Sequence, residues 1–174
     1  YPSLVTKGLG MKILVIGSGG REHAMVWKLA QSPRKPQLYC APGNAGIAEL
    51  AENVNISGED IPQLKSFAQK NKIDLTVVGP EVALVAGITD EFEAVGLKVF
   101  GPCKRGALIE GSKVFAKGFM AKYGIPTAQA ENFSDFKAAA DYVREMEAPL
   151  VIKADGLAAG KGVIICQTEK EAFA

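Results

Sequence analysis

The sequence has few of the residues that build metal centres, disulfide frameworks or membrane spans. Among its 174 residues are three cysteines and one histidine. Cys40, Cys103 and Cys166 are widely spaced and form no C-x-x-C pair. Neither a disulfide framework nor a zinc site is therefore expected, and a cytoplasmic location is predicted. No apolar run approaches the roughly 20 residues that span a bilayer.

The sequence also lacks an excess of charge of either sign. The net charge is +1, which gives no general attraction to nucleic acid or to a membrane surface, so we expect no partner of either kind. Any anion site must then be local. Residues 1–10 have no apolar core like that of a signal peptide, and we expect them to be an upstream extension or an expression remnant.

Strands and helices alternate over the first hundred residues. Short β-branched runs predict buried strands at residues 12–16, 37–41, 74–79 and 97–101. Helices are expected between them, at residues 20–31, after the N-cap Asp60, and at residues 81–95 before Gly96. This alternation predicts a Rossmann-like α/β domain over residues 11–110, with a parallel sheet covered on both faces.

The pattern changes after residue 102. Ser112 is expected to cap a helix that runs to Tyr123, and Ser134 to cap another. Short strands are expected near residues 127–131, 149–154 and 162–167, the last two as an antiparallel pair, with a further helix beginning at Thr168. This α+β arrangement predicts a second, incomplete domain over residues 111–174.

The first loop that could form a binding site is "GSGGREHA" at residues 17–24. It departs from the dinucleotide fingerprint, because Glu22 stands where the third glycine belongs and no acidic residue follows the second strand, so NAD or FAD is disfavoured. The N–H groups of Gly19 and Gly20 at the helix start, with Arg21 beside them, suit a phosphate. A purely structural interpretation is also open, in which the glycines only form the turn.

Two further loops are expected at the same edge of the sheet, "APGNAG" and "GPEVAL". In them, Asn44 can hydrogen-bond a hydroxyl group and Glu81 can accept hydrogen bonds from a sugar diol. Glu81 is also a residue that the first turn of a helix favours in any case. An anion site, an amide and a carboxylate at one edge together predict a site for a sugar phosphate.

The second part of the chain carries three notable lysines. Lys113 opens a helix, where a cation opposes the macrodipole unless an anion completes the site. Lys153 is expected on a half-buried strand face, where it needs a partner or must reach solvent. Lys161 lies between Gly160 and Gly162 in "DGLAAGKG". This loop lacks the P-loop spacing, but it can fold over nucleotide phosphates from a hairpin as a lid.

These motifs together resemble the glycinamide ribonucleotide synthetases, ATP-grasp ligases of purine synthesis. The resemblance runs from Met11 to the last residue. It rests on "VIGSGGREHA", "APGNAG", "DLTVVGPE", "IEGSK", "IPTA" and, most specifically, "VIKADGLAAGKGV". "GPEVAL" replaces the more usual "GPEAPL", and Ile109 stands where leucine is common, but neither departure changes a polar group.

The resemblance implies a pre-ATP-grasp α/β domain followed by the start of an α+β ATP-grasp domain. The enzymes of this family use ATP to join glycine to 5-phosphoribosylamine. The glycine carboxylate is first phosphorylated to glycyl phosphate. The amine then displaces phosphate, which gives glycinamide ribonucleotide, ADP and phosphate.

The same resemblance assigns roles to residues. Substrate contacts are implied for Gly19, Gly20, Arg21, Glu22, Asn44 and Glu81, and ATP contacts for Lys113, Lys153, Gly160, Lys161 and Gly162. Magnesium, or manganese in its place, is the implied metal, with its ligands and the catalytic residues expected beyond residue 174. We therefore expect this chain to be an N-terminal part that is inactive alone.

Two other hypotheses remain open. Another ATP-grasp ligase or carboxylase would share the lysine pattern but lack "GREHA" together with "GPE". A non-catalytic module that binds a nucleotide or a sugar phosphate is the alternative from a different class.

Overall fold

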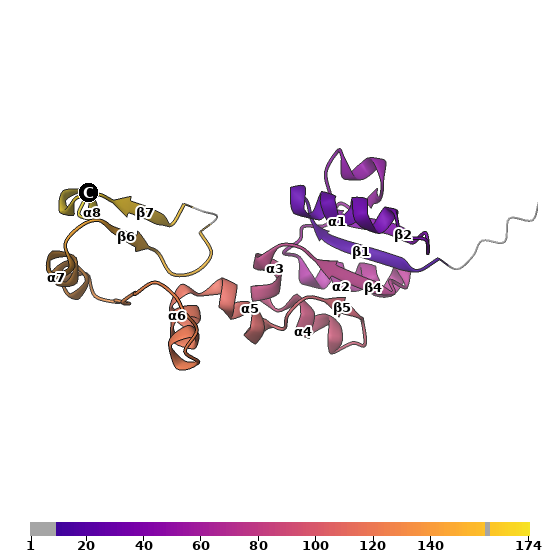
Figure 1. Ribbon diagram of the computed structural model, residues 1–174. Coiled ribbons are helices and arrows are strands. Elements are labelled where there is room, and N and C mark those ends of the chain that lie inside the picture. Colours follow the sequence, from indigo (N-terminus) through magenta and orange to yellow (C-terminus); the bar gives the residue numbers. More distant parts are fainter. Residues whose placement is uncertain (1–9, 159–160) are drawn as a thin grey trace, which may run out of the picture. The chain divides into compact units, whose positions relative to one another are not determined.

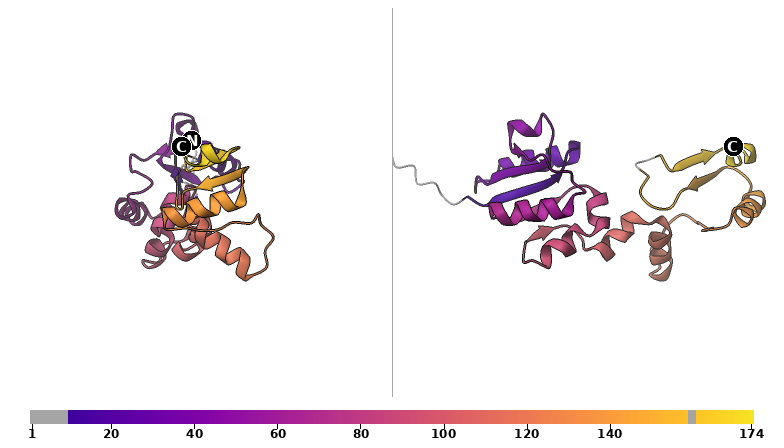
Figure 2. Two further views of the ribbon diagram at one scale, coloured as in Figure 1. Left: turned by 90° about the vertical axis from the view of Figure 1, so that its left-hand side faces the viewer. Right: turned by 180° about the vertical axis from the view of Figure 1, so that it is seen from behind.

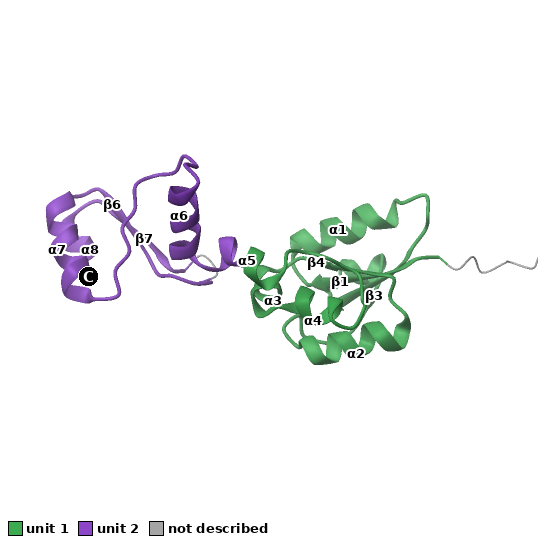
Figure 3. Ribbon diagram, turned by 90° about the horizontal axis from the view of Figure 1, so that it is seen from below, with its two compact units in different colours: residues 1–107 green, residues 108–174 purple. Residues whose placement is uncertain are grey.

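The computed structural model describes residues 10–158 and 161–174. The chain forms two compact units, unit 1 up to Ala107 and unit 2 from Leu108 (Figure 3). Helix α5, Lys104–Gly111, runs across the boundary. Within the described residues, none of the helices combines the length and the apolar character needed to cross a membrane.

Unit 1 is built on a five-stranded parallel sheet (Figure 1). Its strand order is β3-β2-β1-β4-β5, so the chain first extends the sheet on one side of β1 and then crosses to the other. The strands are β1 Lys12–Gly17, β2 Gln37–Pro42, β3 Glu52–Asn53, β4 Leu75–Val78 and β5 Val99–Phe100. This confirms the predicted parallel α/β sheet, and it places β1 at the centre.

Helices cover both faces of this sheet because β1 is apolar on both sides. One face of β1 packs with Val26 of α1 (Gly20–Ala30) and with Ile47 of the 3-10 helix η1 (Ile47–Glu49). The other face packs with Leu64 of α2 (Ile61–Asn71) and Phe92 of α4 (Ile88–Glu93). The view from behind in Figure 2 shows helices on either side of the sheet. The core therefore fixes the carboxyl end of β1, where the first glycine-rich loop begins.

Three predicted helix starts can be compared with their hydrogen bonds. Asp60 accepts from the Gln63 N–H at 3.0 Å, and Ser112 accepts from the Phe115 N–H at 3.1 Å, so both are N-caps as predicted. The prediction that Ser134 caps the next helix is wrong. Asp135 caps α7 (Phe136–Met146), accepting from the Ala138 N–H at 2.9 Å.

The single helix expected at residues 81–95 is also wrong. The segment forms α3, Glu81–Ala86, and α4, separated by Gly87 with φ +100°. The left-handed conformation of Gly87 directs its N–H to the carbonyls of Ala83 and Leu84 and ends the first helix. Apolar residues continue on both sides of this glycine, so the apolar periodicity alone does not predict that the helix ends here.

The strand expected near residues 127–131 does not form. Lys117 Nζ donates to Thr127 Oγ1 at 2.8 Å and to the Ala128 carbonyl at 2.6 Å, which gives that backbone a side-chain partner in place of a ladder. Three short elements that were not predicted do form, namely β3, η1 and α5.

Unit 2 contains α6 (Lys113–Lys122), α7, and the hairpin strands β6 (Leu150–Lys153) and β7 (Val163–Cys166). The two strands pair antiparallel, which confirms the prediction. The helix expected from Thr168 forms as the short α8, Glu169–Ala172, and the Thr168 side chain caps it. Among the described residues of unit 2, only Ala140 and Cys166 are buried hydrophobic side chains.

Candidate functional site

Three loops meet at the carboxyl edge of the unit 1 sheet, as the strand order requires. They follow β1, β2 and β4, which are neighbours. The Gly43 N–H donates to the Gly17 carbonyl and the Gly79 N–H donates to the Ile16 carbonyl, each at 3.1 Å. The loops on both sides are thus fixed to the end of the central strand, which gives the edge a rigid backbone frame.

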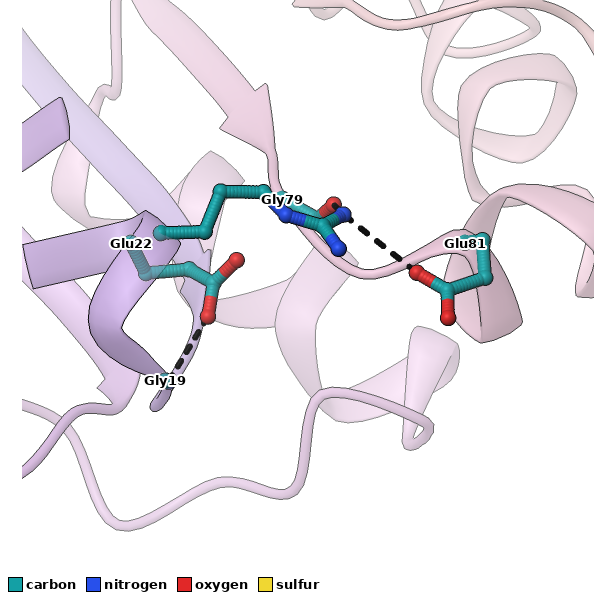
Figure 4. Close-up of polar contacts among 5 residues, drawn as sticks. Gly19, Glu22, Gly79 and Glu81 are labelled. Atoms are coloured by element: carbon teal, nitrogen blue, oxygen red, sulfur yellow. Dashed lines mark hydrogen bonds and ion pairs between the residues drawn. The ribbon is translucent and has the colours of Figure 1, made fainter. Parts of the chain in front are cut away.

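Glu22 occupies the interior of the first loop. Its side chain lies in the first turn of α1 and is only 5% exposed. Its Oε2 accepts from the Gly19 N–H at 2.7 Å (Figure 4). The amide of Gly19, one of the predicted phosphate donors, is therefore already bonded inside the protein. The predicted anion site is left with the N–H groups of Gly20 and Arg21.

Arg21 connects the first loop to the loop after β4. Its Nη1 donates to the Gly79 carbonyl at 2.8 Å and lies 3.3 Å from Glu81 Oε2 (Figure 4). The ion pair is largely exposed, with 60% and 40% of the two side chains accessible, so it adds little stability by itself. The ion pair matters for position, because it brings Arg21 and Glu81, two predicted substrate residues, together at one edge of the sheet.

Asn44 joins the first loop to the loop after β2. Its Nδ2 donates to the Ser18 carbonyl at 2.8 Å, and its Oδ1 accepts from the Ile47 N–H at 2.9 Å. Asn53 Nδ2 in turn donates to the Asn44 carbonyl at 2.8 Å. Both ends of the Asn44 amide are thus engaged within the chain, whereas the sequence had suggested a contact to a substrate hydroxyl.

Two residues at this edge received no role from the sequence. His23 packs against the loop after β2, because a Cβ on Gly46 would lie 2.6 Å from His23 Cε1. The thiol of Cys40 is fully buried and donates to the Gly17 carbonyl at 3.3 Å. Burial, and then the charge of Glu22, raise the pKa of Cys40 to about 11, so the thiol stays protonated at neutral pH and is a poor nucleophile.

In unit 2, an internal carboxylate completes the start of α6. Asp155 Oδ1 accepts from the Lys113 N–H at 2.7 Å and from the Val114 N–H at 3.3 Å, while Ser112 Oγ donates to Asp155 Oδ2 at 3.1 Å. Lys113 Nζ also donates to the Gly156 carbonyl at 2.7 Å. The anion that the sequence required at this helix start is therefore Asp155 itself.

The pKa of the Asp155 carboxyl is held below its ordinary value by these donors. The N–H groups of Gly156 and Val114 have the largest effect, followed by Lys113 and Ser112. All of them stabilise the ionised form. We call the contacts among Ser112, Lys113, Asp155 and Gly156 the α6 clasp.

The remaining predicted ATP residues lie on or near the hairpin. Lys153 is exposed, so the expectation of a half-buried lysine is wrong; it pairs with Val163, on a strand face that is itself open. Lys161 donates its N–H to the Ala158 carbonyl, and the Gly162 carbonyl accepts from the Ala154 N–H, each at 2.8 Å. Gly160 lies outside the described residues.

The described residues contain no group of three or more histidine, cysteine, aspartate or glutamate side chains that could hold a metal ion. Asp155 is the acidic residue next to the predicted ATP lysines, and its oxygens are engaged at α6. The described residues do not fit a magnesium site.

The parallel sheet with its three-loop edge is followed by an α+β unit that matches an ATP-grasp domain, and this match places the chain in the ATP-grasp class. Residues 111–174 match the model described as "Phosphoribosylglycinamide synthetase, ATP-grasp (A) domain", and residues 11–110 match "Phosphoribosylglycinamide synthetase, N domain". The chain belongs to the phosphoribosylglycinamide synthetase family, which confirms the family suggested by the motifs.

Individual relatives support this family assignment. The chain is 60% identical over 162 residues to the phosphoribosylamine–glycine ligase of Caldanaerobacter subterraneus subsp. tengcongensis, covering 93% of this chain and 39% of the relative. It is 57% identical over 166 residues to the Escherichia coli K12 enzyme of the same name, covering 94% and 39%. The chain thus spans 39% of the length of these curated relatives.

Solved structures share the fold. The crystal structure of phosphoribosylamine–glycine ligase from Thermotoga maritima matches with a TM-score of 0.68 and 34% identity, over 93% of this chain and 37% of that one. The N5-carboxyaminoimidazole ribonucleotide synthetase from Thermotoga maritima matches with a TM-score of 0.73 over 94% and 43%. Its identity is 23%, so this second likeness concerns the fold alone.

Proposed function

We propose that this chain supplies the phosphoribosylamine site and part of the ATP site of a phosphoribosylamine–glycine ligase. In the reaction, a glycine carboxylate oxygen attacks the γ-phosphorus of ATP and ADP leaves, which forms glycyl phosphate. The amine nitrogen of phosphoribosylamine then attacks the carbonyl carbon, and phosphate leaves as the amide forms. The family membership and the identity to ligases named for this reaction support the proposal.

The observation that carries the substrate assignment is the arrangement around Arg21. Arg21 and Glu81 lie 3.3 Å apart, between the first loop and the loop after β4. We infer that the phosphate is bound by the N–H groups of Gly20 and Arg21 with the Arg21 guanidinium, since a helix start and a planar cation favour an anion. Glu81 accepts from the ribose hydroxyls, while Gly19 and Asn44 shape the loops.

For ATP, we propose that Lys113 and Lys153 contact the phosphates or the adenine edge, and that the loop motif of Gly160, Lys161 and Gly162 covers the phosphates. The description of residues 111–174 as an ATP-grasp domain supports this. Magnesium supplies charge neutralisation in phosphoryl transfer of this kind. We place its ligands beyond residue 174 and expect residues 1–174 alone to show no glycine-dependent ADP release. The free cysteines Cys40, Cys103 and Cys166 are compatible with a reducing cytoplasm.

Titration with ribose 5-phosphate, a stable analogue without the amine, tests the substrate assignment. Arg21→Ala removes charge-assisted hydrogen bonds, so we expect the Kd measured by calorimetry to rise by about tenfold or more. Arg21→Lys keeps the charge but loses the planar fork, and it is expected to recover only part of the affinity.

Arg34→Ala is the matched control, because Arg34 lies before β2, at the opposite edge of the sheet. Equal losses in the Arg21→Ala and Arg34→Ala variants would show a nonspecific charge effect and contradict the assignment. Binding of ribose 5-phosphate without ADP release, in a chain as long as the ligase relatives, would favour the non-catalytic binding module.

A further inference from the structure

Among the described residues, Glu22 is the only charged side chain that is buried, at 5% exposed. A buried carboxylate is costly unless hydrogen bonds compensate for its lost hydration. Here Oε2 accepts from the Gly19 N–H at 2.7 Å, and the position in the first turn of α1 is favourable for a negative charge. Glu22 is therefore held in one place by local contacts that it makes itself.

Glycines from two loops make the space for this carboxylate. A Cβ on Gly17 would lie 2.5 Å from Glu22 Cγ, and a Cβ on Gly19 would lie 3.0 Å from Oε2. A Cβ on Gly79, in the loop after β4, would collide with Oε1. Glycines in both loops are therefore needed to leave room for the Glu22 side chain. This role is distinct from binding a phosphate.

We propose that Glu22 is a positioning residue that locks the first loop against the loop after β4 and does not itself contact the ligand. Its side-chain oxygen occupies the Gly19 N–H, so this donor is not available to an anion. The ligand phosphate is thereby directed to the N–H groups of Gly20 and Arg21. The ligand part of this inference rests on the proposed function, whereas the lock between the loops stands without it.

The lock is tested on residues 1–174 by NMR, with Glu22→Ala, Glu22→Gln and the exposed control Glu93→Ala. Loss of the acceptor in Glu22→Ala is expected to shift the Gly19 amide proton upfield and to speed its hydrogen exchange by about tenfold. Glu22→Gln keeps a side-chain oxygen for Gly19 and should restore most of the protection. Unchanged Gly19 exchange in Glu22→Ala would overturn the lock.

Ribose 5-phosphate binding by the same variants tests the effect on the ligand. We expect Glu22→Ala to weaken binding by about tenfold and Glu22→Gln to stay within about threefold of the unsubstituted chain, because the lock needs an acceptor rather than a charge. If Glu22→Gln binds as poorly as Glu22→Ala, Glu22 acts by direct contact and the proposal is wrong. If the unsubstituted chain binds no ribose 5-phosphate while Gly19 behaves as expected, the proposed function fails and the lock stands.

A double-mutant cycle with Gly79→Ala connects the two loops. The new methyl group should displace the Glu22 carboxylate and weaken ribose 5-phosphate binding by about fivefold, but by less than about twofold when Glu22→Ala is already present. Equal effects of Gly79→Ala in the two backgrounds would show that Gly79 and Glu22 act independently and would contradict the proposal. Thermal unfolding of each variant identifies any that lose binding by unfolding.

Discussion

The two units use similar strand sequences in different surroundings. Leu14, Val15 and Ile16 in β1 have no exposed surface, whereas Val151 in β6 and Ile165 in β7 are 50% and 67% exposed. Neighbouring strands and helices cover β1 on every side, while β6 and β7 pair only with each other in the described part of the chain. An apolar β-branched run therefore predicts a strand, but its burial depends on what the rest of the chain places over it.

The polar contacts of the two units differ in the same way. In unit 1, hydrogen bonds of Arg21 and Asn44 join loops that the core already holds at one edge. In unit 2, the α6 clasp is exposed, and α6 has no buried residue. We infer that packing sets the stability of unit 1, and that local hydrogen bonds contribute a larger share in unit 2.

Truncating one apolar side chain in each unit gives the largest expected difference. Phe92→Ala removes a fully buried ring and leaves a cavity, so it should lower the free energy of unfolding of unit 1 by about 3–5 kcal/mol. Ile165→Ala removes a side chain that is 67% exposed, and its effect should stay within about 0.5 kcal/mol. Urea unfolding followed by circular dichroism measures both. Similar losses for the two variants would mean that unit 2 has a core of comparable quality.

Much of unit 1 could be predicted from the sequence, because alternation of strands and helices leaves few topologies for a parallel sheet. The loops at its edge followed from the same rule. What Asn44 and Glu22 bind did not follow, because a residue type that suits a ligand equally suits a neighbouring backbone group, and only three-dimensional proximity decides between them. For Asn44 the partner is the Ser18 carbonyl, 26 residues away.

The sequence predictions that the structure contradicts fail for similar physical reasons. Gly87 ended an expected helix through its left-handed φ, which the apolar periodicity does not encode. Lys117 supplied the Ala128 carbonyl with a partner that a strand model would have sought in a neighbouring strand. Lys113 did require an anion, but Asp155 lies 42 residues away in the sequence. Local sequence patterns cannot predict contacts between residues so far apart in the sequence.

Helix caps offer a second, smaller comparison of the units. Asp60→Ala and Ser112→Ala each remove one N-cap, a change worth about 1 kcal/mol. Because α2 buries Leu64 and Ala68, loss of Asp60 should lower the stability of unit 1 in urea. Because α6 buries none of its residues, loss of Ser112 should appear mainly as faster hydrogen exchange within α6. Ser134→Ala is the control, since Asp135 caps α7; a loss as large as that of Ser112→Ala would contradict this assignment.

The α6 clasp should respond to acid, and this is the smallest effect that we predict. The donors around Asp155 lower its pKa below the ordinary 3.8, so the carboxylate and its hydrogen bonds are fully present above that value. The clasp is then lost as the pH falls through the lower pKa of the folded chain, because protonation removes the charge that the N–H groups stabilise. The amide shifts of Lys113 and Val114, followed by NMR from about pH 5 downward, report this step directly. Asp155→Asn has no charge to lose, so its Lys113 and Val114 shifts should stay flat over the same range. A midpoint at or above 3.8 would show that the donors do not favour the ionised form, and the exposed clasp of unit 2 would then contribute nothing to holding α6.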